Sequence, residues 1–124
     1  MSVPILIADD EPNILVSLEF LMKREGYAVH VARDGVEALE VLRRVHPRLV
    51  LLDVMMPRKT GFEVCQEIRQ DESIKDTLVL MLTAKGRETD VVKGLALGAN
   101  AYMTKPFSTR ELVLKVSALL EAPG

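Results

Sequence analysis

The stretch Leu49-Val50-Leu51-Leu52 is a continuous apolar run that ends at Asp53. A strand buried on both faces has this pattern, whereas a strand with one face in water alternates apolar and polar residues. Strands buried on both faces occur in parallel sheets that carry helices on either side. The run therefore indicates the inside of an α/β domain, and it places a carboxylate at the end of a buried strand.

The rest of the sequence alternates short apolar runs with amphipathic segments. This alternation is typical of a parallel sheet whose strands are joined by right-handed helical crossovers. Asp34 followed by Glu37, Thr60 followed by Glu63, and Ser108 followed by Glu111 are spaced as capping boxes that begin three helices. We expect strands at residues 3–8, 27–31, 49–52, 78–82 and 101–103, with helices at 12–25, after Asp34, after Thr60, at 88–97 and after Ser108. We therefore predict one doubly wound α/β sheet of five parallel strands with five helices on both faces.

Length and composition restrict the possible functions. The chain has 124 residues, enough for one hydrophobic core and too few for two independent ones. Its 16 basic and 18 acidic residues give a net charge of −2, which argues against non-specific binding to nucleic acid or an anionic membrane. No apolar run approaches the length of a spanning helix, and no signal peptide opens the chain. The single cysteine, Cys65, cannot form an internal disulfide, so we expect a cytoplasmic location.

Polar residues gather where the predicted strands end. In doubly wound sheets, ligands bind in a crevice beyond the carboxyl ends of the strands. If the strand order is 2-1-3-4-5, that crevice is shared by Asp9, Asp10 and Glu11 after the first strand, Asp53 after the third, Thr83 and Ala84 after the fourth, and Lys105 and Pro106 after the fifth. Each signal is weak alone, because acidic residues also cap helix starts and lysines are common on surfaces.

Together, these groups describe a site for a divalent cation and a tetrahedral dianion. Carboxylates that lie close together repel one another, and a hard cation such as Mg²⁺ removes that conflict by accepting oxygen ligands. A lysine and a hydroxyl on the opposite wall add a positive charge and a hydrogen-bond donor. These are the parts needed to move a phosphoryl group onto an aspartate.

Four motifs resemble those of the response-regulator receiver domain, the CheY-like phosphoacceptor module of two-component systems. They are Asp9-Asp10-Glu11, Asp53-Val54-Met55-Met56-Pro57, Thr83-Ala84 and Lys105-Pro106-Phe107. The resemblance spans essentially the whole chain, and it implies one receiver domain over residues 1–124 with strand order 2-1-3-4-5. It implies a signalling switch that catalyses only its own phosphorylation and dephosphorylation, and therefore no enzyme acting on other molecules.

The resemblance also implies roles for several residues of these motifs. Asp53 is the expected phosphoacceptor. One Mg²⁺ is expected to bind Asp10 directly, Asp9 through water, Asp53, and the backbone carbonyl of Met55. Lys105 is expected to contact the phosphoryl oxygens, and the family has a cis peptide bond at the position of Lys105–Pro106.

Other residues are expected to transmit the signal or to control the lifetime of the aspartyl phosphate. Thr83 is the expected switch hydroxyl, and Tyr102 is the aromatic residue coupled to it. The residues two after the acceptor and two after the switch threonine are Met55 and Lys85. Methionine cannot orient a water molecule, and a lysine can neutralise and cover the phosphoryl group. We therefore expect Met55 and Lys85 to slow hydrolysis of the aspartyl phosphate.

The implied partners are a sensor histidine kinase or phosphotransfer protein, and an output domain or protein that the sequence does not name. The output surface would be the fourth helix, fifth strand and fifth helix. The chain is most similar to receivers of winged-helix transcription factors, but Asn100-Ala101 replaces their acidic pair while Glu111 and Lys115 remain. We therefore expect a monomer or a weak, phosphorylation-dependent dimer, with no direct contact to nucleic acid or membrane.

Three other classes of protein fit parts of the pattern. A Mg²⁺-dependent phosphatase of the haloacid dehalogenase type also forms an aspartyl phosphate, but it needs a second carboxylate where Met55 stands. A flavodoxin-like cofactor carrier needs a phosphate-cradling loop after the first strand, where this chain has Asp-Asp-Glu-Pro. A receiver-like interaction module normally lacks the acceptor, whereas Asp53 is present. The phosphatase is the main alternative.

Overall fold

The computed structural model describes residues 2–84 and 86–121. In this part of the chain, strands and helices alternate throughout. They are β1 (Pro4–Ala8), α1 (Pro12–Arg24), β2 (Ala28–Ala32), α2 (Gly35–Val45), β3 (Leu49–Asp53), α3 (Gly61–Gln70), β4 (Leu78–Ala84), α4 (Glu88–Ala96), β5 (Ala101–Lys105) and α5 (Thr109–Glu121). All pairings in the sheet are parallel, and the order is β2-β1-β3-β4-β5. The predicted fold class and strand order are confirmed.

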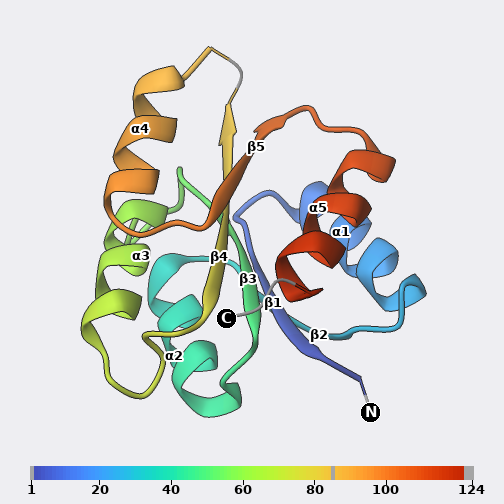
Figure 1. Ribbon diagram of the computed structural model, residues 1–124, viewed down its shortest axis with the longest axis horizontal. Helices are drawn as coiled ribbons and strands as arrows, with labels where there is room; N and C mark the ends of the chain where they lie inside the picture. Colours follow the sequence, from blue (N-terminus) through green and yellow to red (C-terminus); the bar gives the residue numbers. More distant parts are fainter. Residues whose placement is uncertain (1, 85, 122–124) are drawn as a thin grey trace.

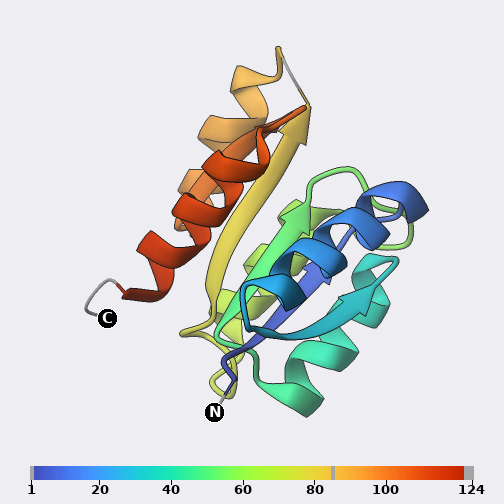
Figure 2. The ribbon, with the colours of Figure 1, turned by 90° about the vertical axis from the view of Figure 1, so that its right-hand side faces the viewer.

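Helices cover the sheet on both faces, as Figures 1 and 2 show: α2, α3 and α4 lie on one face, α1 and α5 on the other. Successive residues of β3 point to opposite faces, and every residue of this strand is buried. Val50 and Leu52 pack in the cluster with α2 and α3, and Leu49 and Leu51 pack in the cluster with α1 and α5. This confirms that the run at 49–52 lies inside the domain.

None of the helices in the described ranges is long and apolar enough to cross a membrane.

The two strands on one side of the sheet are longer than predicted. β4 continues to Ala84 and β5 to Lys105, because Thr83 pairs with Thr104 and Ala84 with Lys105 in the parallel ladder. Polar residues at the end of a strand interrupt the apolar pattern, although the backbone can still pair. The extra pairs hold Thr83 and Lys105 on regular strands rather than on loops.

Of the three predicted capping boxes, the one at α3 is complete, and at α5 the Ser108 hydroxyl accepts the N–H of Glu111 at 2.9 Å. At α3, the Thr60 hydroxyl accepts the N–H of Glu63, and the Glu63 carboxylate accepts the N–H of Thr60. At α2, Asp34 accepts the N–H of Glu37, but the Glu37 carboxylate accepts the N–H of Arg33 instead of that of Asp34. Both arrangements satisfy N–H groups at a helix start.

Arg69, near the end of α3, connects two loops at the amino edge of the sheet. Its guanidinium donates hydrogen bonds to the carbonyl oxygens of Lys75 (2.8 Å), Thr77 (2.7 Å) and Gly98 (2.8 and 3.0 Å) and to Oδ1 of Asn100 (2.8 Å). The same Asn100 oxygen accepts the backbone N–H of Val79 at 2.8 Å. Arg69 thus holds together the loops that precede β4 and β5.

Replacing Arg69 with alanine is expected to lower the free energy of unfolding by about 2 kcal/mol, because several carbonyl groups lose a charged donor at once. Urea denaturation measures the change. Arg44→Ala is the matched control, since this arginine lies exposed on α2, and its effect is expected to stay within about 0.5 kcal/mol. Equal losses in the two variants would contradict the role given to Arg69.

Candidate functional site

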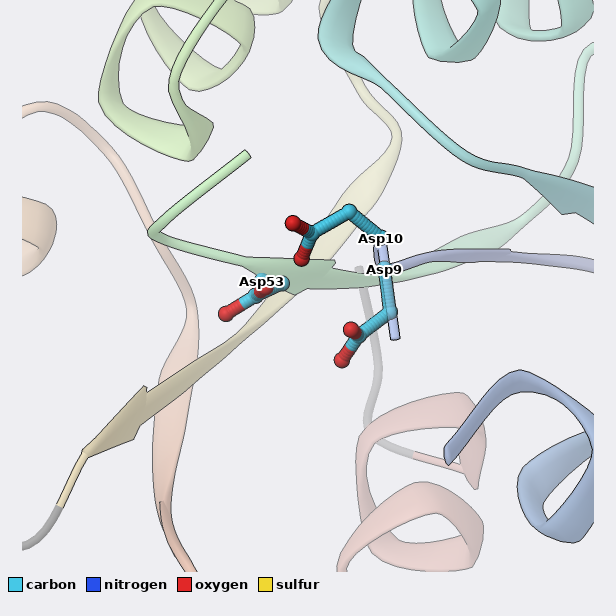
Figure 3. Close-up of side chains that lie close together, drawn as sticks. All are labelled: Asp9, Asp10 and Asp53. Atoms are coloured by element: carbon cyan, nitrogen blue, oxygen red, sulfur yellow. The ribbon is translucent and has the colours of Figure 1, made fainter. Parts of the chain in front are cut away.

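Three aspartates meet at the carboxyl edge of the sheet (Figure 3). Asp9 and Asp10 follow β1, and Asp53 is the last residue of β3. These strands are neighbours, with Ala8 paired to Leu52, so their ends bring the side chains together. One carboxylate oxygen from each aspartate lies within 4.8 Å of the others. Asp9 and Asp53 are buried, whereas Asp10 is exposed.

Lys105 reaches the same cluster from the end of β5. Its Nζ lies 2.8 Å from Oδ2 of Asp9 and 3.4 Å from Oδ1 of Asp53. Burial alone would lower the pKa of Lys105, but hydrogen bonding to Asp9 and the charge of Asp53 outweigh it and raise the pKa. The lysine is therefore cationic in the site. The Lys105–Pro106 peptide bond that follows is cis.

The surroundings of Asp53 disfavour its ionisation. Burial, together with the negative charge of Asp9, raises the pKa of Asp53 from 3.8 to about 7, although Lys105 lowers it in part. Asp53 also accepts a long hydrogen bond of 3.4 Å from the backbone N–H of Met55. In the protein without metal, Asp53 is thus protonated in a large fraction of molecules near neutral pH.

The donor set fits a hard divalent cation. Carboxylate oxygens are ligands that Mg²⁺ prefers, and the exposed Asp10 offers a side open to water. Asp9 already accepts the backbone N–H of Glu11 on Oδ1 (2.9 Å) and Lys105 on Oδ2 (2.8 Å). Both Asp9 oxygens are therefore engaged, and this favours an indirect contact to a cation through water.

Thr83 and Tyr102 lie on the strands next to the cluster. The Thr83 side chain is buried in β4, and its hydroxyl donates to the Met103 carbonyl over 3.5 Å, at the outer limit of a hydrogen bond. Tyr102 lies on β5 with 43% of its surface exposed, and it lines a groove between β5 and α5 together with Leu114. Lys85, expected to control hydrolysis, lies outside the described residues.

Two glycines beside the site were missed by the sequence analysis. A Cβ on Gly61 would lie 2.4 Å from the carbonyl oxygen of Asp53, and a Cβ on Gly35 would lie 2.2 Å from that of Lys59. Each glycine is the first residue of its helix, directly after the capping residue. Glycine is unfavourable in helices compared with alanine, so its presence at both starts was a signal of close backbone approach.

The doubly wound sheet, the acidic cluster at its carboxyl edge and the lysine that faces it define the CheY-like class of α/β domains. The family model described as "Response regulator receiver domain" matches residues 5–117. The chain therefore belongs to the response regulator receiver domain family of two-component systems. Members of this family are signalling switches and not classical enzymes.

Solved structures of response regulators are similar over nearly the whole chain. A candidate response regulator from Chloroflexus aurantiacus J-10-fl is 34% identical, with a TM-score of 0.94 over 98% of this chain and 100% of that one. The chemotaxis response regulator CheY4 of Vibrio cholerae is 30% identical, with a TM-score of 0.90 over 96% and 99% of the two chains. NtrX from Brucella abortus is 29% identical, with a TM-score of 0.90 over 98% of this chain and 27% of that chain.

Proposed function

We propose that this protein is a phosphorylation-activated switch of a two-component phosphorelay, with Asp53 as its phosphoacceptor. The observation that carries this proposal is the placement of the buried Asp53 within 4.8 Å of Asp9 and Asp10 and 3.4 Å from Nζ of Lys105. The phosphoryl donor is a sensor histidine kinase, a phosphotransfer protein or a small acyl phosphate. Phosphorylation then changes the surface of α4, β5 and α5 that an output partner contacts.

Four groups of this chain would hold one Mg²⁺. They are the carboxylates of Asp10 and Asp53, the backbone carbonyl of Met55, and Asp9 through water. When bound, the cation would offset the negative charge of the carboxylates and of the incoming phosphoryl group. In the protein without metal, burial and, after it, the negative charge of Asp9 raise the pKa of Asp53.

Transfer begins with an ionised oxygen of Asp53 in line with the phosphorus atom. A new P–O bond to Asp53 forms while the P–N bond of phosphohistidine, or the P–O bond of an acyl phosphate, breaks. The leaving imidazole or carboxylate takes the electron pair of the broken bond. Lys105, already 3.4 Å from Asp53, neutralises charge on the equatorial phosphoryl oxygens.

The phosphoryl group gives Thr83 a better hydrogen-bond acceptor than the one it has. Its bond to the Met103 carbonyl is long, at 3.5 Å, so the hydroxyl can exchange it for a charged phosphoryl oxygen at little cost. Tyr102, exposed on the neighbouring strand, then moves into the space behind Thr83. The shift reaches α4, which contains Gly94 near its C-terminal end and so has a weaker intrinsic helix preference.

The competing phosphatase of the haloacid dehalogenase type gains no support from the site. Such an enzyme needs a carboxylate two residues after the nucleophile, and that position holds Met55, a residue that is 61% exposed. We also propose that the protein acts in the cytoplasm, without direct contact to nucleic acid or membrane. It is a monomer or a weak, phosphorylation-dependent dimer, because Asn100 binds Arg69 internally where related receivers present an acidic pair.

The proposal is tested by incubating the chain with an acyl phosphate and Mg²⁺ and measuring its intact mass. One labile phosphoryl group should be gained with Mg²⁺ and none after chelation. A gain that is independent of metal, or that continues through many turnovers with release of phosphate at enzyme-like rates, would overturn it.

Hydrolysis of the aspartyl phosphate is expected to be slow. The exposed Met55 side chain cannot orient a water molecule in line with phosphorus, and the sequence places the cation of Lys85 two residues after Thr83. The double variant Met55→Asn/Lys85→Glu is therefore expected to lose the phosphoryl group about tenfold faster, because polar side chains would hold that water. First-order decay of purified phosphoprotein measures the rate, with Glu88→Gln as a control on α4. An unchanged rate in the double variant would contradict the assignment of Met55 and Lys85.

A further inference from the structure

The loop from residue 54 to 60 connects the phosphoacceptor strand β3 to α3. It carries Met55, whose backbone lies beside the carboxylate of Asp53, with the amide N–H 3.4 Å from Oδ1. The start of the loop is fixed to the sheet, since Val54 donates to the Leu82 carbonyl (3.1 Å) and accepts the N–H of Gly61 (2.9 Å). The far half of the loop leaves the sheet and packs on α2.

The contact between the loop and α2 is unusually close at Gly35. This buried residue begins α2, and a Cβ built on it would lie 2.2 Å from the carbonyl oxygen and 2.7 Å from the carbonyl carbon of Lys59. Its N–H points to the carbonyl oxygen of Pro57 over 3.4 Å. Gly35 has no side chain that could bind a cation or a phosphoryl group. It can affect the site only by letting the backbone of Lys59 pack directly against α2.

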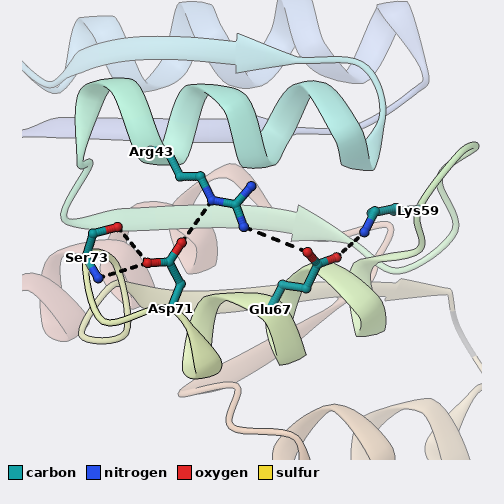
Figure 4. Close-up of polar contacts among 5 residues, drawn as sticks. All are labelled: Arg43, Lys59, Glu67, Asp71 and Ser73. Carbon is teal, nitrogen blue, oxygen red and sulfur yellow. Dashed lines mark hydrogen bonds and ion pairs between the residues drawn. The ribbon is translucent and has the colours of Figure 1, made fainter.

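Side chains on either side of this contact tie the loop down. Arg58 has a left-handed backbone, with φ of 69°, and its guanidinium lies 3.6 Å from the carboxylate of Asp34. Lys59 pairs with Glu67 of α3, and Glu67 lies 3.8 Å from Arg43 of α2 (Figure 4). The loop therefore cannot move away from Gly35 without breaking several contacts.

We propose that Gly35 is a positioning residue for the metal site: it seats the 54–60 loop on α2 and thereby sets the place of the Met55 carbonyl. This inference rests on the proposed function, in which that carbonyl is a metal ligand. A methyl group at position 35 would displace the Lys59 backbone by about 1 Å, and Mg²⁺ tolerates little departure from octahedral geometry.

Gly35→Ala is expected to weaken Mg²⁺ binding by about tenfold. Substitutions of residues that orient metal ligands typically lower metal affinity by this amount. Isothermal titration calorimetry of the full chain with Mg²⁺ measures the affinity without reference to phosphorylation. Amide NMR spectra of the protein without metal should show shifted resonances for residues 54–60 and unshifted ones for β1.

Gly26→Ala is the matched control. Gly26 lies in the turn between α1 and β2, at the opposite edge of the sheet, with φ of 94°, and a Cβ added there would meet no atom within 4 Å. Alanine there strains the backbone by about 1 kcal/mol, so it destabilises the fold while leaving the loop in place. Its Mg²⁺ affinity is expected to equal that of the wild type.

The outcomes separate the two proposals. If the wild type does not bind Mg²⁺, the proposed function fails. If the wild type binds and Gly35→Ala binds equally well, or Gly26→Ala is weakened to the same extent, the role of Gly35 is wrong. Should Gly35→Ala not fold, Arg58→Gly replaces it, because this change frees the loop without a clash and is expected to weaken binding about threefold. Unchanged affinity in Arg58→Gly would then overturn the inference.

Discussion

Replacing Asp53 with asparagine is expected to abolish phosphoryl acceptance completely while the fold is kept. The amide has nearly the same size as the carboxylate, but it has no anionic oxygen to attack phosphorus and it would not form an acyl phosphate. Asp53 is buried at the end of β3, so no neighbouring carboxylate can take its place in line with the donor without a change in the strand.

Intact mass after incubation with Mg²⁺ and an acyl phosphate measures the effect, and circular dichroism checks the fold. Glu11→Gln is the matched control: it also exchanges a carboxylate for an amide near the cluster, but its side chain is 62% exposed and lies 3.8 Å from Lys105 as an outer partner. This control should still be phosphorylated. A stable phosphoryl group on Asp53→Asn would show that another residue is the acceptor.

The same substitution is expected to stabilise the protein without metal at neutral and alkaline pH. The pKa of Asp53 is 3.8 as an ordinary aspartate and about 7 in the folded protein. Between these values the folded protein keeps a proton that the unfolded chain releases, so the contribution of protonated Asp53 is fully present below about pH 4 and is lost as the pH rises through 7. The full difference is on the order of 4 kcal/mol.

Asparagine cannot ionise, so it does not suffer this loss. The free energy of unfolding of Asp53→Asn should exceed that of the wild type by about 4 kcal/mol at pH 8, and the two should converge toward pH 4. Urea denaturation with a chelator present at several pH values measures both. Saturating Mg²⁺ should close the gap by stabilising the wild type. A difference that does not change with pH would show that Asp53 is an ordinary aspartate in the folded protein.

Local sequence signals were sufficient for the alternation of strands and helices and for the polar residues near the carboxyl ends of the strands, whereas the strand order was implied by the resemblance to receiver domains. The apolar run at 49–52 predicted a buried strand, and β3 is buried at every residue. Asp9 and Asp53 could be placed together because they end strands that are neighbours in a doubly wound sheet. These inferences succeeded because they depend on the spacing of apolar residues and on the order of the segments along the chain, and both can be read directly from the sequence.

Contacts between distant backbone segments could not be predicted in this way. Lys105 was expected in the crevice, but its direct contact with Asp9 spans β4 and β3 and depends on a strand that continues past the apolar pattern. The bonds from Arg69 to Gly98 and the approach of Gly35 to Lys59 join segments more than 20 residues apart. Nothing in the local pattern specifies the partner in such a contact, although a glycine at a helix start indicates that one exists.

The strand order also determines how the sheet can assemble as the chain is made. β2 and β3 pair on either side of β1, β4 then joins β3, and β5 joins β4, so each later strand adds to an edge that already exists. The face of the sheet covered by α1 and α5 is completed last, because Leu80 and Leu82 of β4 pack with Leu112 and Val116 of α5. While α5 has not yet left the ribosome, the nascent chain exposes the apolar residues of β4 that α5 later covers. In this interval the chain depends most on rapid folding or on a chaperone.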